Sequence, residues 1–169
     1  MDARVFLDAD LQLDAAVNPD AAAIDSGVFE YPEALTLLSE GGATYRFPSA
    51  ITVDVQDPSL IYFSALTLDN EAAIFLLSNG QATVIFSGGP LVLPVDLLVS
   101  ANSRSLYIAD LAAGEHGQVF RLDLRLRTLE VYASGDSLWG PAGLALDNQT
   151  PALLITGRFP DSDLGSIFE

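Results

Sequence analysis

Several residue types are absent or scarce in this chain of 169 residues, and each scarcity excludes a class of chemistry. Cysteine is absent, so the chain has neither a disulfide framework nor a thiolate nucleophile. The single histidine, His116, excludes a zinc site built from several histidines of one chain. Lysine is absent too, and seven arginines oppose 23 acidic residues, which gives a net charge of −16. We expect this charge to repel nucleic acid and anionic lipid, so neither is an expected partner.

Long apolar runs and the common catalytic motifs are also missing. No stretch reaches the roughly 18 apolar residues of a membrane-spanning helix. Residues 1–4 lack the basic start and apolar core of a signal peptide, so we expect a soluble protein of undefined compartment. The chain contains no glycine-rich phosphate loop, nucleophile elbow or metal-protease helix motif.

The sequence does contain an internal repeat of about 46 residues. Prolines mark it at steps of 46 and 47 residues: Pro48, Pro94 and Pro141. Twelve residues after each proline, a leucine opens an apolar run: Leu60, Leu106 and Leu153. Further along each repeat, a β-branched residue precedes phenylalanine: Ile74-Phe75, Val119-Phe120 and Ile167-Phe168. The repeat predicts modules at residues 2–47, 48–93, 94–140 and 141–169, of which the first matches loosely.

Each module has the pattern of four short β-strands. The apolar runs are rich in Val, Ile, Leu, Phe and Tyr, and turn-forming residues bound them. Asn79-Gly80 lies between two such runs and indicates a hairpin, because both residues tolerate positive φ. Four strands in a module of this length match a β-propeller blade. We therefore predict one all-β domain over residues 1–169: a β-propeller arc of about four four-stranded antiparallel blades, the last incomplete.

An arc of blades exposes an apolar sheet face at each end, which determines the expected partner. We expect a homodimer in which two arcs complete one ring. A closed monomeric ring and a fragment of a longer protein are the alternatives.

Three segments of the third module carry a family resemblance: LPVDLLV at residues 93–99, SLYIAD at 105–110 and GQVFRLD at 117–123. They resemble one blade of the NHL-repeat and senescence-marker-protein/gluconolactonase propellers, to which strictosidine-synthase-like proteins are similar. The resemblance implies a propeller and, in members that are hydrolases, a divalent cation in the central channel, often calcium.

The positions that correspond to those metal ligands do not suit a hard cation, which prefers carboxylates. They are Ser49, Val95 and Ala142, with Ala3 in the first module. We therefore expect a non-catalytic module that binds a small molecule or a protein. The alternative is a calcium-dependent lactonase- or esterase-like hydrolase, in which the cation polarises the ester carbonyl.

Six residues are candidates for a recognition surface on the loop face: Asp96, Asp110, Glu115, His116, Trp139 and Arg158. Asp96 and Asp110 could line the mouth of the channel, although Asp110 could instead cap a turn. His116 could act as a base beside Glu115, or be merely solvated. Trp139 could stack on a ligand or cover the contact between blades. Arg158 could bind an anion or offset nearby carboxylates.

Two acidic segments, residues 8–14 and 161–163, alternate carboxylates in a way that could hold calcium. Neither has the glycine and terminal glutamate of a calcium-binding loop, so turn capping is the expected role. No metal site is assigned from the sequence, and calcium is the one cofactor that the resemblance leaves open.

Overall fold

The computed structural model describes residues 36–135, 137–147, 150, 152–159 and 165–169. The chain divides into two units, Met1–Thr36 and Leu37–Glu169, and every strand described below belongs to the second. Most of the expected first module, residues 2–47, lies outside the described residues, as does the whole of both acidic segments, 8–14 and 161–163. No helix in the described part of the chain has the length and apolar character needed to cross a membrane.

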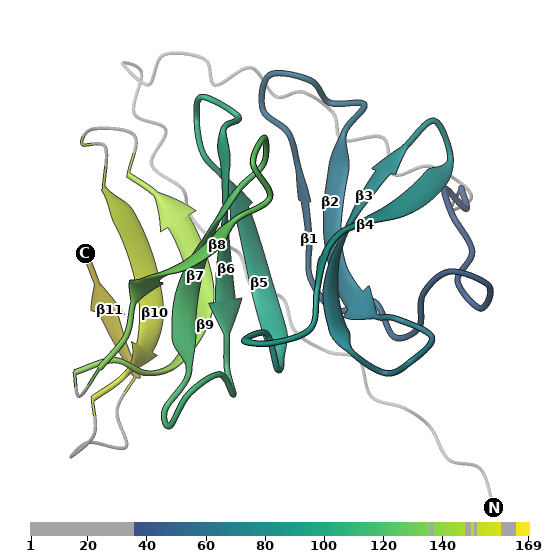
Figure 1. The fold of residues 1–169 in the computed structure, drawn as a ribbon. Coiled ribbons are helices and arrows are strands. Elements are labelled where there is room, and N and C mark those ends of the chain that lie inside the picture. The colour runs from purple at the N-terminus through teal and green to yellow at the C-terminus, as the bar shows by residue number, and fades with distance from the viewer. Residues whose placement is uncertain (1–35, 136, 148–149, 151, 160–164) are drawn as a thin grey trace, which may run out of the picture. The chain divides into compact units, whose positions relative to one another are not determined.

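Three antiparallel sheets form this unit, and the described residues contain no helix (Figure 1). The first sheet has the order β1 (Ile51–Val53), β2 (Ile61–Leu66), β3 (Ala72–Ser78) and β4 (Gln81–Ser87). The second has the order β5 (Pro94–Val99), β6 (Ser105–Asp110), β7 (Gln118–Asp123) and β8 (Leu129–Ala133). The third contains β9 (Trp139–Leu146), β10 (Leu153–Arg158) and β11 (Gly165–Phe168). The all-β prediction is therefore confirmed.

Short turns between consecutive strands make each sheet a meander. The hairpin predicted at Asn79-Gly80 joins β3 to β4, and both residues have positive φ, 51° and 75°. Two central residues with positive φ match the right-handed twist of the flanking strands, which explains why this dipeptide stands there.

The strand registers confirm the expected equivalence of the three phenylalanines. Each phenylalanine of the repeat pairs with the equivalent residue of the strand before it. The pairs are Phe75 with Phe63, Phe120 with Ile108 and Phe168 with Ile155. A residue and its counterparts in the other sheets can therefore be compared directly.

The expected alignment of the leucines is wrong in the first sheet. The pairs that flank the first turn of each sheet are Val53–Ile61, Val99–Leu106 and Leu146–Leu153. Ile61, not Leu60, is therefore the counterpart of Leu106 and Leu153. Seven residues lie between the paired residues Val53 and Ile61, and six lie between Val99 and Leu106. The first turn is therefore one residue longer, and a turn can lengthen without disturbing the ladder.

Apolar side chains fill the space between neighbouring sheets. Between the first two sheets, a cluster includes Ile74 from β3 and Leu106 and Phe120 from the second sheet, all fully buried. Between the second and third sheets, Val119 of β7 packs with Leu153 and Ile155 of β10. The second sheet is thus packed on both faces, and Figure 1 shows the three sheets side by side in chain order.

A buried aspartate joins the first two sheets at one of their ends. Asp54, just after β1, accepts hydrogen bonds from the amides of Gln56 and Asp57 and from the hydroxyl of Ser103 in the β5–β6 turn. The Gln56 side chain also donates to the Ala101 carbonyl at 3.0 Å. Burial opposes ionisation of Asp54, but these hydrogen bonds outweigh it and hold the pKa of its carboxyl below the usual value.

Candidate functional site

The candidate site lies where the loop after β6 meets the start of β9, and a buried carboxylate holds this loop. Asp110, the last residue of β6, is fully buried. Its Oδ2 accepts the Val92 amide at 2.8 Å, and its Oδ1 accepts the amides of Leu93, Ala112 and Ala113 at 2.9, 3.1 and 2.9 Å. One side chain thus ties the segment before β5 to the loop after β6. Of the two roles expected for Asp110, the structure supports the capping of a turn through backbone amides. The role at the mouth of an opening is corrected, because the carboxylate is buried.

A glycine at the far end of the same loop lets it close against β9. Gly117 has φ of 89° and donates its amide to the Ala113 carbonyl at 3.0 Å. A methyl group at this position would lie 2.6 Å from Pro141 Cδ and 2.9 Å from the Leu111 carbonyl oxygen. Only glycine fits this backbone and this space. Gly117 was not among the six candidate residues, although a glycine between a polar loop and a strand was a usable signal.

His116 and Trp139 form the centre of the site. The two rings stack with centroids 4.0 Å apart and planes 20° from parallel. The Gly140 amide donates to the His116 carbonyl at 2.7 Å, so the backbones of the loop and of β9 are linked beneath the rings. Glu115 is exposed, and its Oε1 lies 3.8 Å from His116 Nε2. Trp139 of β9 thus stacks on His116 of the loop after β6, across the boundary between the second and third sheets. Of its two expected roles, this placement agrees with covering a contact between sheets.

Arg158 completes this cluster from the neighbouring strand. It is the residue of β10 that pairs with Trp139 of β9, and it is exposed. A methyl group at Gly140 would lie 3.8 Å from Arg158 Nη2 and 3.3 Å from Leu111 Cδ1, so the guanidinium and an apolar side chain flank the same point. Arg158 forms no ion pair with any residue that the structure describes. Glu115, His116, Trp139 and Arg158 therefore lie in one cluster.

Asp96 lies apart from the cluster and joins the second sheet to the third. Its Oδ2 accepts the Leu144 amide of β9 at 2.7 Å, and its Oδ1 accepts the adjacent Leu97 amide at 2.9 Å. Both carboxylate oxygens therefore have backbone partners. Asp96 therefore holds two sheets together, a role different from the expected one at the mouth of a channel.

The residues at the positions implied for calcium do not fit a hard cation. The Ser49 hydroxyl lies 2.8 Å from the Ser64 hydroxyl and donates to the Pro94 carbonyl at 3.0 Å. Val95 and Ala142 carry no oxygen in their side chains. Among the described residues, no three His, Asp or Glu side chains gather in a group that could hold a metal ion. We derive no step that depends on a metal.

Comparison with known proteins adds no family to this geometry. No family model matches the chain, and no curated protein matches it significantly.

Proposed function

We propose that this chain is a non-catalytic binding module of the β-propeller type, which recognises its ligand through Glu115, His116, Trp139 and Arg158. The observation that carries the proposal is the stack of His116 on Trp139, with Arg158 on the adjoining strand. Aromatic and guanidinium groups side by side are typical of ligand and protein recognition sites.

The arrangement of the sheets supports the assignment to propeller blades, of the kind found in NHL-repeat and gluconolactonase-like proteins. Each sheet runs in chain order from an inner strand outwards, and the first strands contact one another: β1 with β5, and β5 with β9. Neighbouring sheets pack face to face through apolar side chains. Successive antiparallel meanders that pack in this way are the building plan of a propeller.

The chemistry of the cluster favours a carboxylate attached to an aromatic or apolar group. The exposed guanidinium of Arg158 can bind a carboxylate through two parallel hydrogen bonds. The rings of Trp139 and His116 and the half-exposed side chain of Leu111 offer apolar contact beside it. Because the protein is strongly anionic, a bound anion requires a specific pairing of this kind.

Titration with benzoate tests the proposed site. Trp139 is the only tryptophan, so its fluorescence reports directly on the site. We expect a saturable change in emission with benzoate, and at least a tenfold smaller response at equal concentration with the neutral benzyl alcohol. Arg158→Gln should abolish the benzoate response because it removes the bidentate donor.

Arg125→Gln is the matched control, since Arg125 is also an exposed arginine but lies after β7, away from the cluster. This variant should bind benzoate as the unaltered chain does. Equal responses to the acid and the alcohol, or an unchanged response in Arg158→Gln, would contradict the proposed recognition. Calcium-dependent hydrolysis of a simple lactone would contradict the non-catalytic assignment.

A further inference from the structure

The outer face of the third sheet exposes positions that are buried in the other two sheets. This face consists of Ala145, Leu154, Thr156 and Ile167. Ile167 is 75% exposed, whereas its counterparts Ile74 and Val119 are 0% exposed between sheets. The repeat therefore places an apolar residue suited to a sheet contact where the described chain supplies no neighbour.

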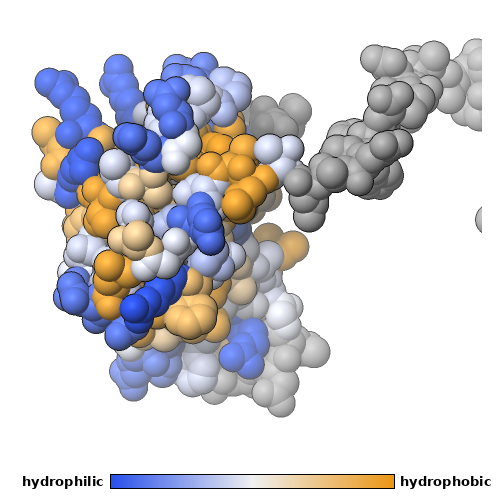
Figure 2. Space-filling view, turned by 90° about the vertical axis from the view of Figure 1, so that its right-hand side faces the viewer, coloured by the Kyte–Doolittle hydropathy of each residue, from blue (hydrophilic) through white to orange (hydrophobic). Residues whose placement is uncertain are grey.

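The outer face of the first sheet shows the same contrast at the other end of the unit. Ile51 and Val53 of β1 are 65% and 45% exposed. Their counterparts in β5, Leu97 and Val99, are 3% and 1% exposed because they pack between the first and second sheets. Figure 2 looks onto the side where the first sheet lies and shows apolar patches among hydrophilic side chains.

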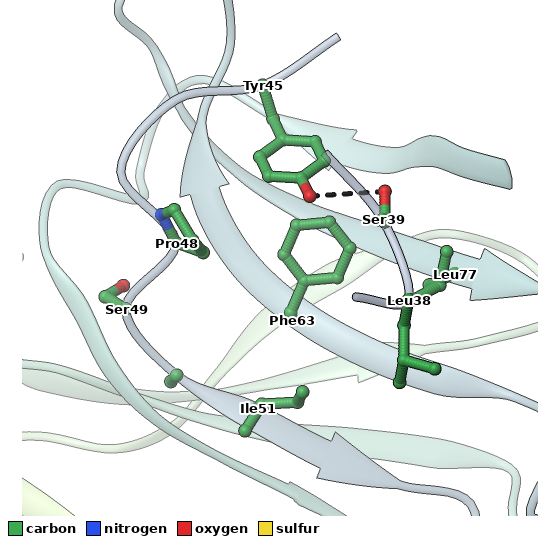
Figure 3. A pocket seen from close by; sticks show the side chains of 9 residues that line it. Leu38, Ser39, Tyr45, Pro48, Ser49, Ile51, Phe63 and Leu77 are labelled. Carbon is green, nitrogen blue, oxygen red and sulfur yellow. Dashed lines mark hydrogen bonds between the residues drawn. The ribbon is translucent and has the colours of Figure 1, made fainter. Parts of the chain in front are cut away.

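Tyr45 covers only part of this outer face of the first sheet. Its ring stands over Phe63, with centroids 4.8 Å apart (Figure 3). Phe63 in turn stacks on Phe75. Beside these rings lies an apolar hollow of about 290 Å³, which Ile51 and Leu38 help to line. Among the described residues, none covers Ile51 and Val53 of the inner strand as Tyr45 covers Phe63. The hollow can accept a side chain from a partner.

The two contacts inside the unit show what packs on such faces. Between the first and second sheets, the face that carries Ile74 packs on the face that carries Leu97 and Val99. Between the second and third, the face that carries Val119 packs on the face that carries Leu144. The outer face of the third sheet, which carries Ile167, corresponds to the faces that carry Ile74 and Val119. The outer face of the first sheet, which carries Ile51, corresponds to the faces that carry Leu97 and Leu144. The chain therefore exposes both halves of one further sheet contact.

We propose that these two outer faces bind each other between two copies of this chain, head to tail. A hollow of about 280 Å³ on the third sheet, lined by Gly143, Ala145 and Ile167 among others, leaves room for side chains of the opposing β1. Each copy offers one face of each kind, so two copies form two identical contacts and close as a symmetric pair. This interface is separate from the ligand site and does not depend on it.

Mass measurement in solution by light scattering tests the proposal. We expect twice the mass of one chain for the unaltered protein. Ile167→Lys and Ile51→Lys should each halve the measured mass, because each places a charge in both contacts of the pair. Leu126→Lys is the matched control: Leu126 is 67% exposed in the turn after β7, and this variant should keep the doubled mass.

Mixing the two altered chains separates head-to-tail pairing from other arrangements. Ile167→Lys keeps an intact first sheet and Ile51→Lys keeps an intact third sheet, so an equimolar mixture should regain the doubled mass through one contact. Far-UV circular dichroism identical to that of the unaltered chain shows that the variants are folded. A single-chain mass for the unaltered protein, a doubled mass for folded Ile167→Lys, or no recovery in the mixture overturns the proposal.

Discussion

At the scale of single residues, Asp110 holds two loops of the second sheet together. Its carboxylate binds four amides from two loops that are far apart in the sequence. The loop that carries Glu115 and His116 starts directly after it. The position of the candidate site therefore depends on a side chain that is fully buried beneath it.

Replacement of Asp110 by asparagine tests this support. The amide group of asparagine can accept through one oxygen only, and its NH₂ group would face a backbone donor. We expect Asp110→Asn to lower the free energy of unfolding by about 2 kcal/mol, the scale of a buried donor left without a partner. Urea unfolding measures the change. Asp123→Asn, which alters a carboxylate that caps the more exposed β7–β8 turn, should cost less than half as much; equal losses would contradict the special role of Asp110.

The stack of the only histidine on the only tryptophan gives a direct optical signal. We expect His116→Gln to change Trp139 emission, because the substitution removes the ring that contacts the indole. Steady-state emission of the two chains measures the effect. Identical emission from both chains would show that the two rings are not stacked in solution.

At the scale of elements, the strands are repeated and the polar links between sheets are not. Asp54 links the turns of the first and second sheets, whereas Ser100 occupies the corresponding position after β5. At the other end, the Ser49 hydroxyl binds the Pro94 carbonyl, and Asp96 binds the Leu144 amide. Apolar packing is thus common to the two contacts, and each has its own polar connection.

Asp54 makes the contact between the first two sheets dependent on pH. Because the pKa of Asp54 is lowered in the folded chain, the unfolded chain takes up the proton first as the pH falls. The stabilisation by ionised Asp54 is complete above the usual aspartate pKa of about 4 and is lost as the pH falls through the lower, folded value.

We expect Asp54→Asn to cost about 1–2 kcal/mol of unfolding free energy at pH 7 and much less at pH 3. Urea unfolding at both pH values measures the difference between the two chains. Asp57→Asn is a suitable control, because the Asp57 carboxylate bonds only within its own turn, to Ser59. A cost for Asp54→Asn that does not change with pH would contradict the role of the ionised carboxylate.

At the scale of the whole molecule, the regular array has consequences at its ends. A residue inside the array packs on the next sheet, and its counterpart at an end meets solvent, as Val119 and Ile167 show. The burial of apolar area gives such a face a strong tendency to find a partner. The net charge of −16 opposes association of any two copies, so a stable pair requires apolar faces that match closely.

The strands and the hairpin turn were predictable because they depend on local pattern. Alternating apolar residues and the Asn79-Gly80 turn act within a few residues, and both were identified correctly. That Ile61, and not Leu60, is the counterpart of Leu106 was not predictable from spacing alone. Spacing cannot separate a longer turn from a shifted strand, while the hydrogen-bonded register does so directly.

The sequence by itself determined the all-β class and the repeating strands. Only the tertiary structure decided that Asp110 is buried beneath four amides, that Asp96 joins two sheets, and that Ile51 and Ile167 lack the cover their counterparts have. Strand formation follows from short-range periodicity, whereas the role of a carboxylate or an apolar side chain depends on which distant segment lies opposite it.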